Sequence, residues 1–130
     1  MIDKSEITQI KTKPDPFEAF NLSQAIAFGD LIFVSGQAAL DLEGNIQGIG
    51  NFDLQAEVSI KNLEKVLKAG GSDLSKVLKV TIFMKDMNQY TDINKIYSSF
   101  FNDDPPAREA IEVSKLPKDV NVEISVIARK

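Results

Sequence analysis

The segment that most constrains the fold is an alternating stretch near the C-terminus, residues 120–128. Apolar side chains occupy every second position, at Val120, Val122, Ile124, Val126 and Ala128. The polar residues between them are Asn121, Glu123 and Ser125. A period of two is typical of a strand that buries one face. The segment therefore predicts a strand with an apolar face in the core and a polar face outside it.

Other segments supply strands to pair with this one. The β-branched, apolar run from Val77 to Met84 predicts a buried strand, and Ala107 to Val113 predicts another. Two short runs joined by Gly29-Asp30 predict a hairpin over residues 23–34. The first 20 residues are polar and predict an extended arm, with a short strand at Ile7 to Ile10.

Two segments carry helical spacing instead. Asp53 to Ala69 has apolar residues three and four apart, with Asn51 or Asp53 as its cap and Gly70-Gly71 at its end. The second stripe runs from Tyr90 to Phe101, with Asp86 or Asn88 as its cap, and its aromatic side chains are interpreted as core.

This order of elements predicts an α+β fold in one domain, residues 1–130. Right-handed crossovers would place both helices on one face of a single mixed β-sheet. The other face is expected to carry Arg108 and Ala110, beside Asn121, Glu123 and Ser125 from the neighbouring strand. An uncovered face of such mixed character predicts a homo-oligomer.

Composition excludes several kinds of chemistry. The sequence contains no Cys and no His, which removes thiolate catalysis and the commonest metal ligand. Asp103-Asp104 is interpreted as a solvated loop and not as a metal pair, and no metal or cofactor is expected. The net charge of −4, with scattered lysines, disfavours nucleic-acid binding. No apolar run could span a membrane or form a signal peptide, and a cytoplasmic location is the default expectation.

One dense C-terminal pattern resembles a known family. Its parts are Pro106-Ala107-Arg108, Leu116 to Val120, and Val122-Glu123-Ile124, with Ile127-Ala128 after them. Upstream, Ser23-Gln24-Ala25, Ser35-Gly36-Gln37 and Phe83 to Asp86 match too, as does Asn94 with the aromatic residues after it. Together they resemble the Rid/YjgF family of reactive-intermediate deaminases over residues 20–129.

The resemblance implies a chorismate-mutase-like fold and a homotrimer with clefts between subunits. It implies hydrolysis of 2-imino or 2-enamino acids to 2-keto acids and ammonia, without a cofactor. Arg108 would bind the substrate carboxylate and Glu123 would position water or exchange a proton. Ser35, Gly36, Asn94 and the backbone of Ala110 would line the pocket.

The sequence departs from the family at Leu22, where many members have a tyrosine that lines the cleft. Leu22 supplies no phenol hydroxyl, which leaves open a non-enzymatic trimer that binds small carboxylates. Ribonuclease activity, ascribed to some relatives, finds no His or basic stripe here. Taken alone, Arg108 and Glu123 would be interpreted as interface or solvated charges, Ser35-Gly36 as a strand-end turn, and Asn94 as a helix-surface residue.

Overall fold

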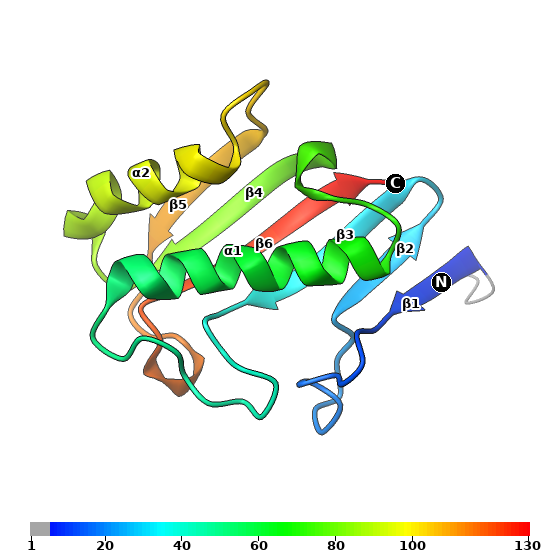
Figure 1. Ribbon diagram of the computed structural model, residues 1–130, viewed down its shortest axis with the longest axis horizontal. Coiled ribbons are helices and arrows are strands. Elements are labelled where there is room, and N and C mark those ends of the chain that lie inside the picture. The colour runs from blue at the N-terminus through cyan, green and yellow to red at the C-terminus, as the bar shows by residue number, and fades with distance from the viewer. Residues whose placement is uncertain (1–5) are drawn as a thin grey trace.

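The alternating and β-branched segments all become strands of one mixed sheet. The computed structural model describes residues 6–130, and its strand order is β1-β2-β3-β6-β4-β5 (Figure 1). The strand bounds are β1 Ile7–Ile10, β2 Ala25–Phe28, β3 Leu31–Gln37, β4 Val77–Met84, β5 Ala107–Glu112 and β6 Val122–Arg129. The predicted arm thus contributes a strand, because β1 pairs with β2.

The last strand, β6, lies between β3 and β4 and is antiparallel to both. The predicted hairpin is confirmed, since β2 and β3 pair around Gly29, whose φ of 60° suits a tight turn. β5 pairs only with β4, in parallel, and ends the sheet.

Two helices connect the parallel strands and lie over one face of the sheet, as predicted (Figure 1). Helix α1 spans Phe52–Ala69, and of the two candidate caps it is Asn51 whose side chain accepts a hydrogen bond from the Leu54 backbone N–H at 3.1 Å. Helix α2 spans Tyr90–Phe100, and Asp86 caps the 3₁₀ turn Met87–Gln89 that precedes it. Further 3₁₀ turns occupy Leu74–Lys76 and Pro117–Asp119.

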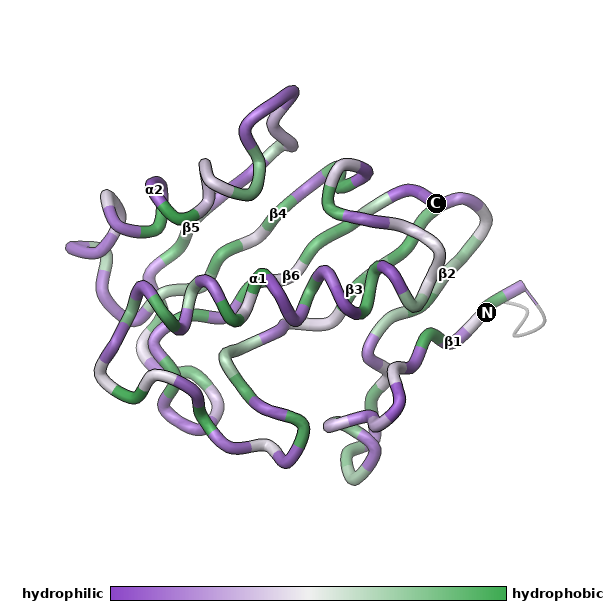
Figure 2. Tube along the Cα trace, in the orientation of Figure 1, coloured by the Kyte–Doolittle hydropathy of each residue, from purple (hydrophilic) through white to green (hydrophobic). Residues whose placement is uncertain are grey.

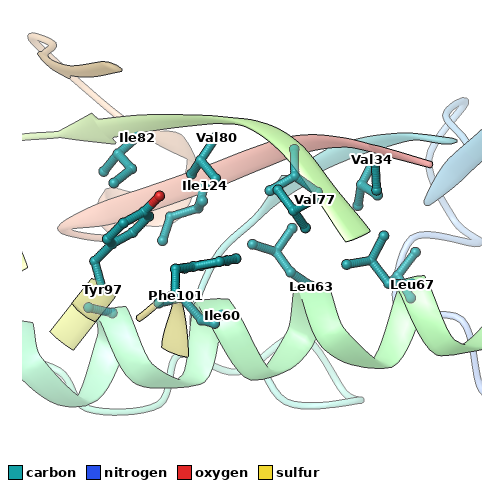
Figure 3. Packing of buried hydrophobic residues seen from close by; sticks show 14 of the residues in the cluster. Val34, Ile60, Leu63, Leu67, Val77, Val80, Ile82, Tyr97, Phe101 and Ile124 are labelled. Carbon is teal, nitrogen blue, oxygen red and sulfur yellow. The ribbon is translucent and has the colours of Figure 1, made fainter. Parts of the chain in front are cut away.

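The hydrophobic core lies between the helices and the strands. Hydropathy alternates along both, so that apolar side chains gather in this layer (Figures 2 and 3). Ile60, Leu63 and Leu67 of α1 are fully buried against strand residues that include Ile82 and Ile124. Each such side chain contributes about 1.5–3 kcal/mol through burial, which fixes α1 on the sheet.

The structure corrects the predicted position of Arg108. Arg108 and Ala110 are in register with Val80 and Ile82, which are fully buried beneath the helices. Residues in register share a face, so both belong to the helix side of the sheet. Glu123 is in register with Phe83 on the opposite side. The expectation that Arg108 and Glu123 share one face on neighbouring strands is wrong. Strand β4 separates their strands, and the two residues are in register with β4 residues that face opposite sides.

No helix among residues 6–130 covers the outer face of the sheet (Figure 1). Phe33, on β3, lies there with 42% of its surface exposed. The homo-oligomer inferred from an uncovered face remains a prediction. Within residues 6–130, neither helix has the length and apolar character that crossing a membrane requires.

Candidate functional site

The predicted site residues form two half-sites on opposite faces of the sheet. The first half-site surrounds Arg108, whose Nη2 donates to Asn94 Oδ1 at 2.7 Å and to Tyr90 Oη at 3.0 Å. Its guanidinium carbon lies 4.7 Å from the centre of the Tyr97 ring, within range of a cation–π interaction. Helix α2 therefore supplies a hydrogen-bonded and stacked seat for this one arginine.

Tyr97 is the rigid part of that seat. Its ring stacks on Phe101 with centroids 4.7 Å apart, and only 7% of the residue is exposed. Figure 3 shows its hydroxyl pointing toward the sheet, near Val80 and Ile82. This oxygen is buried without a partner among the described residues, and burial raises the Tyr97 pKa, an effect that the nearby Arg108 charge opposes. The ring is consequently held by packing.

The second half-site is a pocket of about 320 Å³ on the other face. It is lined by Phe17, Phe20, Leu22, Ser35, Gly36, Ala38, Leu40, Pro117, Lys118 and Glu123. The pocket forms where the register of β3 against β6 shifts between Val34 and Gln37. Such irregularities re-aim side chains and are frequent beside active sites. Here the shift brings Ser35-Gly36 alongside Glu123.

Gly36 is required by close packing and not by an unusual backbone angle. A Cβ at this position would lie 2.7 Å from both Cδ and Oε2 of Glu123. Any larger residue would therefore displace the carboxylate. Ser35 is held by its own bond, because its Oγ donates to the Ser23 carbonyl at 2.7 Å. Gly36 and Ser35 thus form a floor of the pocket against which the Glu123 carboxylate packs closely.

Glu123 forms no ion pair among the described residues, although Lys118 lines the same pocket. Among the described residues, no side chain forms an ion pair or a hydrogen bond with it, and burial raises its pKa above the usual value of 4.5. A carboxylate with a raised pKa and free oxygens can accept a proton from water and return it.

One wall of the pocket is an irregular loop that is closed by a pair of hydrogen bonds. Thr12 N–H donates to Gln24 Oε1 at 2.6 Å, and Gln24 Nε2 donates to Thr12 Oγ1 at 3.1 Å. Between these residues, Phe20 and Leu22 are 58% and 46% exposed. The loop therefore presents apolar side chains above Glu123 and Ser35.

The structure groups the predicted residues without uniting them. Leu22, Ser35, Gly36 and Glu123 line one pocket, whereas Arg108, Asn94 and Ala110 lie on the helix side. Tyr90 is a functional candidate that the sequence interpretation assigned to the core. It is 42% exposed and bonded to Arg108. The available signal was its position four residues before Asn94, which places both on one face of α2.

The described part of the chain contains no cluster of metal-ligating side chains. No group of three or more His, Cys, Asp or Glu side chains there could hold an ion. The chemistry on hand is therefore a guanidinium, a carboxylate, hydroxyls and an amide.

Comparison with known proteins identifies the family. The model described as Endoribonuclease L-PSP matches residues 11–130. A RutC family protein of Pyrococcus abyssi is 39% identical over 96% of this chain and 97% of its own length. The 2-iminobutanoate/2-iminopropanoate deaminase of Mus musculus is 37% identical over 92% of this chain and 88% of its own.

Solved structures agree with the sequence relatives. The Yersinia pestis protein YyfA, described as a member of the conserved Rid family, superposes with a TM-score of 0.89 at 35% identity, over 95% of this chain and 99% of that one. The fold is thus that of a class of small α+β proteins with one mixed sheet and two helices. The chain belongs to the Rid/YjgF family, which the L-PSP model describes.

Proposed function

We propose that this protein hydrolyses reactive 2-imino and 2-enamino acids to 2-keto acids and ammonia. The observations that carry the proposal are an arginine held on helix α2 by Asn94 and, in a separate open pocket, the Glu123 carboxylate without an ion-pair partner among the described residues. Family membership and the name of the mouse relative support it.

Arg108 is suited to bind the substrate carboxylate. A guanidinium is always charged and offers five N–H donors in a plane. Asn94 and Tyr90 engage Nη2 only, so Nε and Nη1 remain available. Binding the carboxylate there fixes the neighbouring imine carbon, and a fixed position is itself a large contribution to rate.

Glu123 is suited to handle the protons of hydrolysis. Water attacks the imine carbon and a C–O bond forms, while Glu123 accepts a proton from that water and delivers it to the imine nitrogen. The resulting carbinolamine then loses ammonia as its C–N bond breaks and the hydroxyl becomes the keto group. An enamine enters the same route after its terminal carbon is protonated. No oxidant or cofactor is consumed.

Arg108 and Glu123 are too far apart in this fold to act together within one subunit. Arg108 and Glu123 lie on opposite faces, and their strands are two apart, or about 10 Å within the sheet. We therefore propose a homotrimer in which Arg108 of one subunit faces the partner subunit's Glu123 across each cleft. The uncovered outer face, with Phe33 exposed on it, supports this assembly.

The direct test generates 2-iminobutanoate in situ from threonine with a pyridoxal-phosphate dehydratase and follows its loss with and without this protein. Wild type should accelerate the loss. Arg108→Ala should abolish the acceleration, and Arg108→Lys should restore little of it, since an ammonium lacks the planar array of donors. An Arg108→Ala variant as active as wild type would refute the proposal.

Leu22 and Phe20 favour a second candidate, a trimer that binds small carboxylates without turnover. Both side chains give the pocket an apolar wall where a polar group could assist water. The same assay separates the two functions. Binding of 2-ketobutanoate without imine hydrolysis would favour the second.

A further inference from the structure

We infer that Tyr90 is a substrate-binding residue, whose hydroxyl donates to the carboxylate that Arg108 holds. The inference rests on the proposed function for the identity of the ligand. It concerns a hydroxyl of this chain that the resemblance did not assign to the site.

The first step is the donor count of Arg108. Nη2 carries two hydrogens, and it has two acceptors, Asn94 Oδ1 and Tyr90 Oη. The fork-like contacts that a guanidinium makes with a carboxylate, across its end or along its Nε side, use an Nη2 hydrogen. Because both Nη2 hydrogens are already bonded, one oxygen of the substrate carboxylate accepts from Nη1. The other carboxylate oxygen then lies beside Asn94 and Tyr90.

The second step is the hydrogen of Tyr90. Its oxygen accepts from Arg108 at 3.0 Å, so its own O–H is free to donate elsewhere. The described residues give that hydrogen no acceptor, and the residue is 42% exposed. A hydroxyl that accepts from a cation is also polarised toward donation. Tyr90 therefore completes the carboxylate site with an O–H on the side where Nη2 of Arg108 has no N–H left.

The third step separates Tyr90 from the other tyrosine beside Arg108. Tyr97 lies closer to the guanidinium, but its hydroxyl is buried and points toward the sheet (Figure 3). Tyr97 can support the arginine only through its ring. The solvent-facing phenol of Tyr90 is thus the tyrosine hydroxyl that a ligand on Arg108 can reach.

The test compares Tyr90→Phe with wild type and with Ser99→Ala. Tyr90→Phe removes one oxygen and keeps the ring. Ser99→Ala removes an exposed hydroxyl from the same helix, where it donates only to the Ile96 carbonyl. Calorimetry measures the Kd of 2-ketobutanoate, and the imine assay measures KM and kcat. Tyr90→Phe should raise Kd and KM about tenfold and leave kcat within about twofold, while Ser99→Ala changes neither.

The outcomes are distinct. Unchanged or tighter binding in Tyr90→Phe overturns the inference, since tighter binding means that the phenol competes with the ligand. Weakened binding in a protein with no imine turnover supports Tyr90 while the proposed function fails. A wild-type protein that binds no 2-ketobutanoate overturns the inference as well.

Discussion

Gly36 leaves just enough room for the Glu123 carboxylate, because a Cβ at position 36 would lie 2.7 Å from Glu123 Cδ and Oε2. The contact falls on the far end of a flexible side chain and not on backbone. A substitution there can be absorbed by rotating the glutamate. Replacing Gly36 is therefore expected to affect the position of the Glu123 carboxylate, and so catalysis, more than the stability of the fold.

Gly36→Ala should lower kcat by about tenfold to a hundredfold, since a displacement near 1 Å is costly for a positioned proton acceptor. The melting temperature should change little. The measurement is kcat for 2-iminobutanoate hydrolysis together with a thermal melt.

Gly70→Ala is the matched control for that change. A Cβ at Gly70 would lie 2.6 Å from Ile10 Cδ1 inside the core, so overpacking should cost about 1–3 kcal/mol of unfolding free energy. Activity should persist below the melting transition. The reverse pattern, with Gly36→Ala unstable and Gly70→Ala inactive, would contradict this assignment.

Removing the Tyr97 hydroxyl should stabilise the protein. The oxygen is buried without a partner among the described residues, and an unsatisfied buried hydroxyl costs about 1–3 kcal/mol. Tyr97→Phe keeps the ring beneath Arg108 and should raise the unfolding free energy by about 1 kcal/mol, measured by urea titration. A loss of stability would mean that the hydroxyl has a bonding partner in solution.

Glu123 gives stability a pH dependence of known sign. Burial raises its pKa in the folded protein above the usual value of 4.5, so the folded state holds this proton more tightly than the unfolded state. The contribution of protonated Glu123 to the free energy of unfolding is fully present below the pKa of the unfolded state. It is lost as the pH rises through the pKa of the folded state. Glu123→Gln should therefore melt higher than wild type at pH 7, with the difference shrinking toward pH 4. A constant difference over that range would contradict this prediction.

Activity should also depend on the ionisation of Glu123, but it should rise with pH where the stability contribution of this residue falls. Proton acceptance requires the ionised form, so kcat/KM should fall as the pH drops through a pKa above the ordinary carboxyl range. The pH–rate profile of wild type measures it. The uncatalysed decay of the imine at each pH is the control, because it reports changes in the ionisation of the substrate itself.

Mixed trimers test whether the site spans two subunits. Arg108→Ala and Glu123→Gln should each be inactive alone. Co-refolded at equal amounts, they should regain about one quarter of wild-type activity, because a random cleft pairs an intact Arg108 with an intact Glu123 at that frequency. Mixing without refolding is the control. No recovery would place both residues in one subunit's site.

Much of the fold was predictable because its signals are local. The alternation in residues 120–128 and the run from Val77 to Met84 predicted strands that the structure confirms as β6 and β4. Gly29 was predictable as a turn residue, and the cap of α1 was narrowed to Asn51 or Asp53, of which the structure shows Asn51.

The face of Arg108 was not predictable in the same way. β5 alternates Ala107, Glu109 and Ile111 with Arg108, Ala110 and Glu112, so neither phase is clearly apolar. At a sheet edge both faces are partly exposed, and periodicity loses its meaning. The insertion of β6 between β3 and β4 is a long-range pairing that no local pattern encodes. Tyr90 was missed because helical spacing does not distinguish a buried ring from one whose hydroxyl reaches a neighbour.

The clamp between Thr12 and Gln24 has a consequence for how the pocket can diverge. It closes the loop that carries Phe20 and Leu22 at its base, where Gln24 is 2% exposed. Changes of length or sequence within residues 13–22 would be contained there and would leave the sheet register untouched. The wall over Glu123 is thus an exchangeable module, and new ligand preferences could arise in it while the strands that hold the reacting groups stay the same.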